Sequence, residues 1–534
     1  DAQRVEARPA FFCLVARNEK RVASSEKDSD PPLTTHHSPL TTHHSTLTTH
    51  HSPLSTRDSL LASRLSPLAS RFSLRASRLS PLASRFLVRY DARSVNSLYH
   101  SERETAVANR FCLCLLSVGL LLPPTWAGNW GHWRGDGNGV ATDANPPVRW
   151  SSSLNVKWKV PIPGYGSGSP VVWEDRVFVV SGVPVGDGSS GRARRRSRAS
   201  QQQPLEFTLY CFDRATGGLQ WKRVATVATP HEGTHDTNNF AAASPCTDGQ
   251  HVYAHFGSRG LYCYTLDGAL VWKRDDFGKM QTRNTFGEGS SPTIEGEKIL
   301  VPWDHEGPSA LYALNKLPGK TIWKVERDEP TCWATPLVVE TGAGKQVVMN
   351  GQNYARGYDL ETGEELWRCG GQTERPVASA VSGQGLIFVG SGFRGAFLGA
   401  FQPDQRGDLE GSEAVVWSVD RDTPDIASPL LSSGRLYYYK AKSGVISCVD
   451  AKTGKPHFGP TRVEGLGTIY ASPIAADGRV YLTDRAGTTV VIRDSEDYEV
   501  LASNSVGETV DATPAPVDDE LFIRGEQHLF CIAE

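Results

Sequence analysis

The sequence predicts an all-β fold, an eight-bladed β-propeller, from three recurring features. A Ser/Thr-Pro pair recurs eight times, a short apolar strand follows each pair, and several units then carry an Asp-x-x-Thr-Gly turn that leads to a Trp. Four short strands in a unit of about 40–50 residues is the pattern of a propeller blade. The composition agrees, because 51 Gly and 33 Pro but only 2 Met favour many strands and tight turns.

The pair is the most regular marker of the repeat. Successive pairs are mostly 41 to 49 residues apart, and one of them has Ala in place of Pro. We expect each pair to begin the innermost strand of a blade. The eight are Ser169-Pro170, Ser244-Pro245, Ser291-Pro292, Thr335-Pro336, Ser379-Ala380, Ser428-Pro429, Ser472-Pro473 and Thr513-Pro514.

The end of the unit predicts a hairpin between the two outer strands. In Asp213-Arg-Ala-Thr-Gly217, the Asp side chain can accept backbone N–H bonds while Gly takes positive φ at no steric cost. An indole recurs just after this turn, and we expect it to pack between neighbouring blades rather than to do chemistry. These docking residues are Trp158, Trp221, Trp272, Trp323, Trp367 and Trp417.

The ends of the repeat predict how the ring closes. The eighth unit stops at Glu534 without its Trp strand, whereas the strand around Trp158 precedes the first unit and has no blade of its own. The N-terminal strand therefore completes the last blade, which removes free sheet edges. The first step between pairs is longer than the others, because an insertion at residues 183–204, expected to be disordered, falls in blade 1.

The residues before the propeller differ in kind. Residues 1–106 hold low-complexity repeats, including paired histidines, and we expect disorder or an upstream extension annotated in error. Residues 107–127 have the order of a signal peptide: a charge at Arg110, twelve apolar residues from Phe111 to Leu122, and a small residue at Ala127. We expect a start near Val107, cleavage after Ala127 and export to the periplasm or beyond, with a propeller at 128–534 and no integral membrane segment.

The Asp-x-x-Thr-Gly-x-x-x-Trp turn resembles the pyrroloquinoline-quinone-like propeller repeat. Quinoprotein alcohol dehydrogenases share this repeat with the propeller lipoprotein of the bacterial outer-membrane assembly machinery, and the resemblance covers residues 150–534. The opening Asn129-Trp130-Gly-His-Trp133-Arg134-Gly135 is also similar to the start of exported propellers of planctomycete-type bacteria. The chain departs from the assembly lipoprotein because the expected signal ends in Thr-Trp-Ala without a lipid-modified Cys.

Under the dehydrogenase resemblance, pyrroloquinoline quinone with Ca²⁺ would be the cofactor, held by carboxylate and amide oxygens. No adjacent cysteine pair of the alcohol dehydrogenase kind is present in the sequence. Cys211, Cys263, Cys448 and Cys531 occupy equivalent strands and are expected to be core residues, whereas one disulfide among Cys246, Cys332 and Cys369 stays open. We predict no cofactor and no metal site.

Two further motifs have simpler explanations. His231-Glu232-Gly-Thr-His235 matches a zinc-protease string, but that site needs a helix, which Pro230 and Gly233 oppose. We therefore expect a polar loop between blades. The Arg tract at 192–198 could contact an anionic polymer, although a solvated, disordered loop is the better explanation.

Residues just before the Ser/Thr-Pro pairs are expected at one mouth of the central channel, where propeller ligands bind. They form a mixed polar surface suited to a peptide, a sugar or a small anion. The candidates are His235, Asn239, Glu288, Trp333 and Tyr470, with Asp304 and Arg327 as neighbours from connecting loops.

These observations favour a non-catalytic extracytoplasmic scaffold for a protein or polymer partner. The alternative is a quinone-dependent oxidoreductase. The formal net charge of −3 gives no electrostatic reason to expect nucleic acid.

Overall fold

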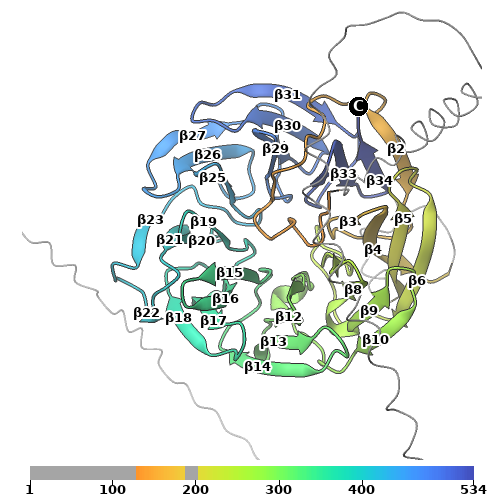
Figure 1. Cartoon of the computed structure of the whole chain (residues 1–534), viewed down its shortest axis with the longest axis horizontal. Helices are drawn as coiled ribbons and strands as arrows, with labels where there is room; N and C mark the ends of the chain where they lie inside the picture. The colour runs from red at the N-terminus through yellow and green to blue at the C-terminus, as the bar shows by residue number, and fades with distance from the viewer. Residues whose placement is uncertain (1–127, 187–202) are drawn as a thin grey trace, which may run out of the picture. The chain divides into compact units, whose positions relative to one another are not determined.

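The computed structural model describes residues 128–186 and 203–534, and these form a ring of eight antiparallel blades. Figure 1 shows the blades following one another in chain order around the ring. The predicted all-β propeller is confirmed: the described residues contain no α-helix, only the two short 3₁₀ turns η4 (Gly257–Arg259) and η5 (Arg283–Thr285). Nor do they contain a helix long and apolar enough to cross a membrane.

In seven blades, four main strands follow one another in sequence from the channel outward, whereas the outermost strand of the eighth blade comes from the N-terminal side of the propeller. Blades 1 to 4 comprise β3 (Val171–Trp173), β4 (Arg176–Pro184), β5 (Leu205–Asp213) and β6 (Leu219–Ala228); β7 (Cys246–Thr247), β8 (His251–His255), β9 (Leu261–Thr265) and β10 (Leu270–Arg274); β11 (Thr293–Glu295), β12 (Lys298–Trp303), β13 (Ser309–Asn315) and β14 (Thr321–Arg327); β15 (Leu337–Thr341), β16 (Gly344–Met349), β17 (Ala355–Asp359) and β18 (Glu365–Cys369). Blades 5 to 8 comprise β19 (Val381–Gly383), β20 (Leu386–Ser391), β21 (Phe397–Phe401) and β23 (Val415–Val419); β24 (Leu430–Ser432), β25 (Arg435–Tyr439), β26 (Val445–Asp450) and β27 (Pro456–Arg462); β28 (Ile474–Ala476), β29 (Arg479–Thr483), β30 (Thr488–Arg493) and β31 (Val500–Ser505); β32 (Ala515–Val517), β33 (Glu520–Arg524), β34 (His528–Ile532) and β2 (Val156–Pro161).

The last blade is closed by the N-terminal strand, as the sequence predicts. β2 pairs antiparallel with β34, so residues from both ends of the propeller share one sheet. Two short strands extend blades in parallel: β1 (Val140–Ala141) beside β28, and β22 (Gly407–Asp408) beside β18. The apolar core lies between blades, because the second and third strands bury almost all their side chains.

The insertion in blade 1 is shorter than expected. β4 continues through Val183 to Pro184 and pairs with β5 from Leu205 onward, so the strands extend past the predicted start of the insertion. Residues 187–202, with the Arg tract, lie outside the described residues, as do the expected low-complexity region 1–106 and signal segment 107–127.

The outer turns have the hydrogen bonds that the sequence suggests. Asp213 Oδ1 accepts the Thr216 backbone N–H at 2.8 Å and the Thr216 hydroxyl at 2.6 Å, while Gly217 takes a φ of 71°. These bonds lower the pKa of Asp213. The same contacts recur at Asp359 and Asp450, so one local motif forms this turn in three blades.

Five outer turns, including these three, receive an indole from the preceding blade. Trp221 Nε1 donates to Leu266 O of blade 2 at 2.9 Å, and a Cβ added to Gly268 would lie 2.9 Å from the Trp221 ring. Trp158, Trp272, Trp323 and Trp417 make equivalent bonds to the carbonyls of Arg214, Lys316, Leu360 and Ala451.

Trp367 departs from this arrangement. Its Nε1 donates at 2.8 Å to Gln346 Oε1 of the same blade, and its side chain is fully buried. The connection between β21 and β23 in the next blade is long, carries β22 and has no Thr-Gly turn to receive the indole. Trp367 instead stacks on Phe401 of blade 5 with ring centroids 6.4 Å apart.

The cysteines of the described propeller are all thiols. The seven in the described residues are buried and unpaired, so Cys246, Cys332 and Cys369 form no disulfide. Cys211, Cys263, Cys448 and Cys531 lie on third strands, opposite the aromatic residue of the fourth strand. They are core residues, as expected, because the small thiol leaves room for the facing ring.

Candidate functional site: one end of the central channel

The segment Gly128–Ala141 crosses the inner strands and closes one end of the channel. Figure 1 shows it, in orange, in the inner part of the ring. Its backbone and side chains bond to blades 1, 2, 3, 5, 6, 7 and 8. In the order of these blades, the groups that bond to the segment are the Val172 backbone, Thr247 N, Ile294 N, Ser382 N, Pro429 O, Ala475 N and the Asp518 carboxylate. At blade 4, Gly137 approaches Leu337 so closely that a Cβ would lie 2.9 Å from its methyl carbon.

Arg134 anchors this segment to the inner strands of two blades. Its Nη2 donates to Asn138 O at 2.9 Å, to Pro429 O at 2.8 Å and to Pro473 O at 3.4 Å. The side chain is fully buried, and burial lowers its pKa to about 9. Arg134 thereby links the segment to the inner strands of blades 6 and 7, and its neighbour Trp133 faces the channel.

A ring of hydroxyl groups encircles the channel above this floor. The backbone N–H of each repeat Ser or Thr donates to the hydroxyl of the next blade's Ser or Thr, at 2.8 to 3.2 Å. Seven of the eight junctions in the described propeller carry this bond. The participants are Ser169, Ser244, Ser291, Thr335, Ser379, Ser428, Ser472 and Thr513. The repeat pair therefore does more than begin the strand, because it ties each blade to the next.

A cavity of about 310 Å³ occupies the other end of the channel. All eight ring residues line it, which places the ring at the wall of the cavity. The aromatic residues Trp133, Phe286, Trp333, Phe393 and Tyr470 also line it. A volume of this size lies at the lower end of the range for small-molecule sites.

Three of the predicted residues line this cavity, namely His235, Trp333 and Tyr470. Tyr470 donates to Thr237 Oγ1 at 2.9 Å, which joins the loop before blade 7 to the loop before blade 2. Thr237 Oγ1 also lies 2.8 Å from His235 Nδ1. Trp333 Nε1 donates to Gly287 O at 2.7 Å. These bonds fix the loops around the open end.

Positive charge predominates around the cavity. Arg375 and Lys442 line it together with one acid, Asp511, whose Oδ1 lies 2.9 Å from Arg485 Nε. Partial burial lowers the pKa of His235, and Asp236 opposes this shift. The charges of Lys442, Arg375 and Arg485 lower it further. The positive charges of Lys442, Arg375 and Arg485 are therefore close enough to disfavour protonation of His235.

Arg375 is the most enclosed of these cations. Its side chain is 9% exposed and its guanidinium carbon lies 3.7 Å from the centroid of the Phe393 ring. Nη2 donates to Asp425 Oδ2 at 3.1 Å, while the buried Nε has no hydrogen-bond partner among the described residues. A buried donor without a partner is costly, and Arg375 as a residue also lines the cavity.

Two other predicted residues support the loops instead. Asn239 donates to Ser167 Oγ at 3.0 Å and accepts the Ala241 N–H at 3.0 Å. Glu288 accepts from the Ser258 backbone at 2.7 Å, from the Ser258 hydroxyl at 2.6 Å and from Arg259 Nη1 at 3.0 Å. Both side chains are occupied by these bonds, and neither lines the 310 Å³ cavity.

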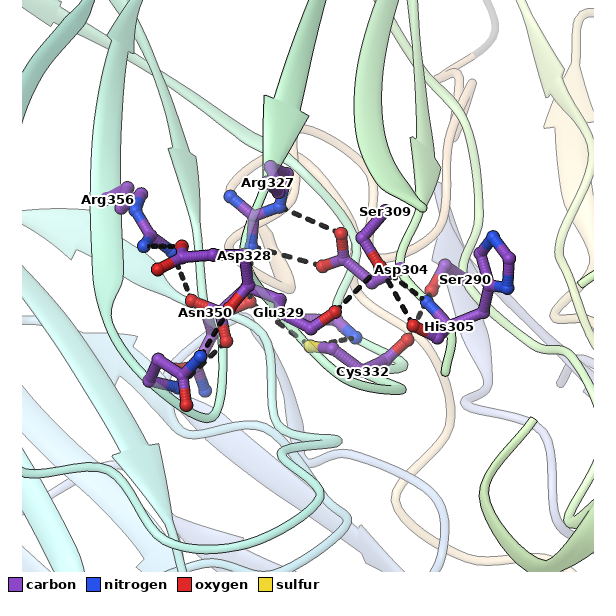
Figure 2. Close-up of polar contacts among 12 residues, drawn as sticks. Ser290, Asp304, His305, Ser309, Arg327, Asp328, Glu329, Cys332, Asn350 and Arg356 are labelled. Carbon is purple, nitrogen blue, oxygen red and sulfur yellow. Dashed lines mark hydrogen bonds and ion pairs between the residues drawn. The ribbon is translucent and has the colours of Figure 1, made fainter. Parts of the chain in front are cut away.

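Asp304 and Arg327 form a buried ion pair, shown in Figure 2. Arg327 Nε and Nη2 donate to the two Asp304 oxygens at 2.8 and 3.1 Å, and Nη1 donates to the Tyr358 hydroxyl at 2.7 Å. The Arg327 side chain is fully buried. Both residues belong to blade 3, and Arg327 reaches blade 4 through Tyr358. Neither residue lines the 310 Å³ cavity.

The His-Glu-x-x-His string forms a loop, as expected. His231 Nε2 lies 2.6 Å from Met280 O, and Glu232 accepts from the Thr282 backbone at 3.2 Å, so the two side chains bond to the protein. No group of three His, Cys, Asp or Glu side chains within the described chain is arranged to hold a metal.

The sequence did not identify Arg375, Lys442 or the closing segment as parts of the site. Arg375 lies in the connection from blade 4 to blade 5, and Lys442 lies between β25 and β26. Neither belongs to a motif, so only the ring geometry brings them together. The motif around Trp133 and Arg134 was visible, but its position in the channel was not.

Comparisons with known proteins agree with this fold. A model of the family described as outer membrane protein assembly factor BamB matches residues 205–388. No curated protein matches the sequence. Quinohemoprotein alcohol dehydrogenase from Comamonas testosteroni is 11% identical, with 78% of this chain and 81% of that chain covered and a TM-score of 0.52. BamB from Moraxella catarrhalis is 10% identical, with 70% and 98% covered and a TM-score of 0.46.

At these identities, the solved structures share only the fold with this chain. The family match adds the repeat itself, since residues 205–388 include the Asp-x-x-Thr-Gly turns at Asp213 and Asp359. The chain is an eight-bladed β-propeller, and residues 205–388 of it match the BamB family model.

Proposed function

We propose that this chain is an exported, non-catalytic binding propeller that presents the open end of its channel to a protein or polymer partner. The observation that carries the proposal is the asymmetry of the channel. Gly128–Ala141 closes one end through bonds to seven blades, while the other end holds a 310 Å³ cavity bordered by loops. A rigid ring with one open, loop-bordered face suits recognition.

The chemistry of the cavity favours binding over quinone-dependent oxidation. Calcium takes six to eight oxygen ligands, among them carboxylates. The cavity lining contains one carboxylate, Asp511, and this group already lies against Arg485. The residues present therefore fit a calcium-bound quinone poorly, and we derive no reaction step through one.

Export and partner binding both accord with the family. The matched family is described as an outer membrane protein assembly factor, a role carried out outside the cytoplasm. Residues 107–127 have the order of a signal peptide. We therefore place the propeller outside the cytoplasm, with its partner at the open face.

The first test is calorimetric titration of the full chain with pyrroloquinoline quinone, with and without Ca²⁺. We expect no Ca²⁺-dependent binding. A dissociation constant of about 1 µM or lower, about −8 kcal/mol, would overturn the proposal and favour the oxidoreductase.

The second test locates the partner. A photo-crosslinking residue is introduced at Asp236, an exposed position beside His235 at the open end, and separately at Val416 on the outer strand β23. In cells of the source organism, we expect a discrete crosslinked species from position 236 and none from position 416. Equal crosslinking from both positions, or none from either, contradicts a partner at the open face.

A further inference from the structure

The hydroxyl ring presents hydrogen-bond donors to the cavity. A hydroxyl carries one O–H donor and two lone pairs. Seven ring hydroxyls already accept a backbone N–H, and none of the seven donates to another residue of the described propeller. Each hydroxyl therefore has its O–H proton and one lone pair left to offer. A wall of such hydroxyls suits a ligand rich in hydroxyl and other acceptor oxygens.

The cations add a preference for negative charge. Arg375 is paired with Asp425, and Asp511 is paired with Arg485, so these four charges balance. Lys442 makes no ion pair with any other described residue, and it lines the cavity. Arg375 lines the same cavity. An oxyanion would satisfy both cations through charge-assisted hydrogen bonds.

Aromatic faces define the rest of the ligand. Phe286 and Trp333 line the cavity with ring centroids 6.5 Å apart, beside the donor ring. A sugar ring presents hydroxyl oxygens to donors and C–H groups to aromatic side chains. An aromatic acid would leave most of the hydroxyl donors without acceptors, which costs binding energy. The combination of donors, cations and rings thus fits a sugar that carries an acidic group.

We propose that the open end of the channel binds an acidic sugar residue, with its carboxylate or sulfate at Arg375 and Lys442 and its ring hydroxyls toward the Ser/Thr ring. This inference rests on the proposed function and identifies the polymer partner as an acidic polysaccharide. The sugar is bound and not altered.

The test is calorimetric titration of the full chain with D-galacturonate, D-glucuronate, D-glucose, sodium sulfate and trigalacturonate. We expect at least one uronate to bind about tenfold or more tightly than glucose, because glucose lacks the charge. Lys442→Met should weaken uronate binding by about tenfold or more. Lys440→Met is the matched control, since Lys440 is two residues away, pairs with Asp422 and does not line the cavity.

The outcomes separate this inference from the proposed function. Glucose binding equal to that of the uronates, or an unchanged affinity in Lys442→Met, overturns the acidic-sugar site. Sulfate binding as tight as both uronates also overturns it, since the sugar then contributes nothing. If trigalacturonate binds more tightly than galacturonate, the result supports binding of the end of a polysaccharide chain. Equal binding supports a site that contacts one sugar residue.

Arg375→Met tests the enclosed cation, and its fold is checked by circular dichroism before titration. If that variant does not fold, the Lys442 and Lys440 pair decides the question alone. Absence of uronate binding with an intact crosslink from position 236 overturns the sugar inference and leaves the binding propeller standing. Loss of the crosslink counts against the proposed function instead.

Discussion

Arg214 of blade 1 and Glu520 of blade 8 form an ion pair, with Nε 2.6 Å from Oε2, across the seam where the first and last blades meet. Each side chain is 10% exposed. Arg214 also reaches Asp518 at 2.8 Å, and Asp518 accepts the Gly128 N–H. Among the described residues, this seam is the one junction without the hydroxyl-ring bond, since none joins Thr513 N to Ser169. The ion pair is one of the contacts that join these two blades.

Arg214→Met should destabilise the closed ring. Removing one partner of a buried pair leaves the other charge uncompensated, at about 3–5 kcal/mol. Lys157 stays 2.6 Å from Glu520 and offsets part of that loss, so we expect the free energy of unfolding to fall by about 2–3 kcal/mol. Urea denaturation monitored by tryptophan fluorescence measures it.

The control for that variant is Arg493→Met. Arg493 and Glu499 are also in contact, at 2.5 Å, but both side chains are about half exposed. An exposed pair contributes little to stability, so the change in the free energy of unfolding should be small. Equal losses in the two variants would show that the seam pair has no special role.

The hydroxyl ring should contribute to stability through its hydrogen bonds. Ser428 Oγ accepts the Ser379 N–H at 2.8 Å between blades 5 and 6. Ser428→Ala leaves that buried N–H without an acceptor, which costs about 1–3 kcal/mol. Ser428→Thr keeps the hydroxyl and should cost less, because Thr335 and Thr513 occupy the same position in other blades. Urea unfolding curves of the two variants give the comparison. Equal losses in the free energy of unfolding would argue against a stabilising hydrogen bond to the Ser428 hydroxyl.

The Gly of the outer turn should be required for indole docking. A Cβ at Gly363 would lie 2.8 Å from the Trp323 ring, and its φ is 78°. Gly363→Ala therefore combines a backbone cost of about 1 kcal/mol with a packing cost of about 1–3 kcal/mol. Gly478→Ala is the control for the backbone cost alone. Its φ is also positive, at 66°, but its added Cβ would have nothing within 4 Å. Thermal unfolding of both variants isolates the packing cost, and similar melting temperatures would contradict it.

The sequence predicted the parts of the fold that repeat. The Ser/Thr-Pro pairs, the second strands and the closing strand around Trp158 are each visible as local patterns, and the structure has all of them. Repeats are predictable because each blade solves the same packing problem with the same residues. Trp367 shows the limit of this reasoning, since its different partner depends on an insertion in the next blade.

The candidate site was less predictable, because it is built from residues that do not repeat. His235, Trp333 and Tyr470 were found from their position before the pairs. Arg375 and Lys442 come from connections of irregular length, and sequence alone does not show which way such loops fold. Asp304 and Arg327 were expected near the channel, yet two opposite charges in one blade can also pair with each other inside the protein.

Acid should destabilise the propeller partly through His255. This side chain is 2% exposed, and burial lowers its pKa to about 4 from the ordinary value of 6.5. The folded protein keeps His255 neutral, whereas the unfolded chain takes up a proton below pH 6.5. The stabilising contribution is therefore complete above about pH 6.5 and is lost as the pH falls toward about 4. Between pH 7 and pH 4.5, this single group accounts for about 2–3 kcal/mol.

His255→Gln removes that titration without introducing a charge. The variant should be less stable than the wild type at pH 7, because the ring lies 6.4 Å from Trp303 in a packed region. Its free energy of unfolding should fall less steeply between pH 7 and pH 4.5, by about 2–3 kcal/mol over that interval. Urea titrations at several pH values measure both slopes. A variant whose slope equals that of the wild type would show that His255 is protonated in the folded protein, or that acid destabilises the propeller through carboxylates alone.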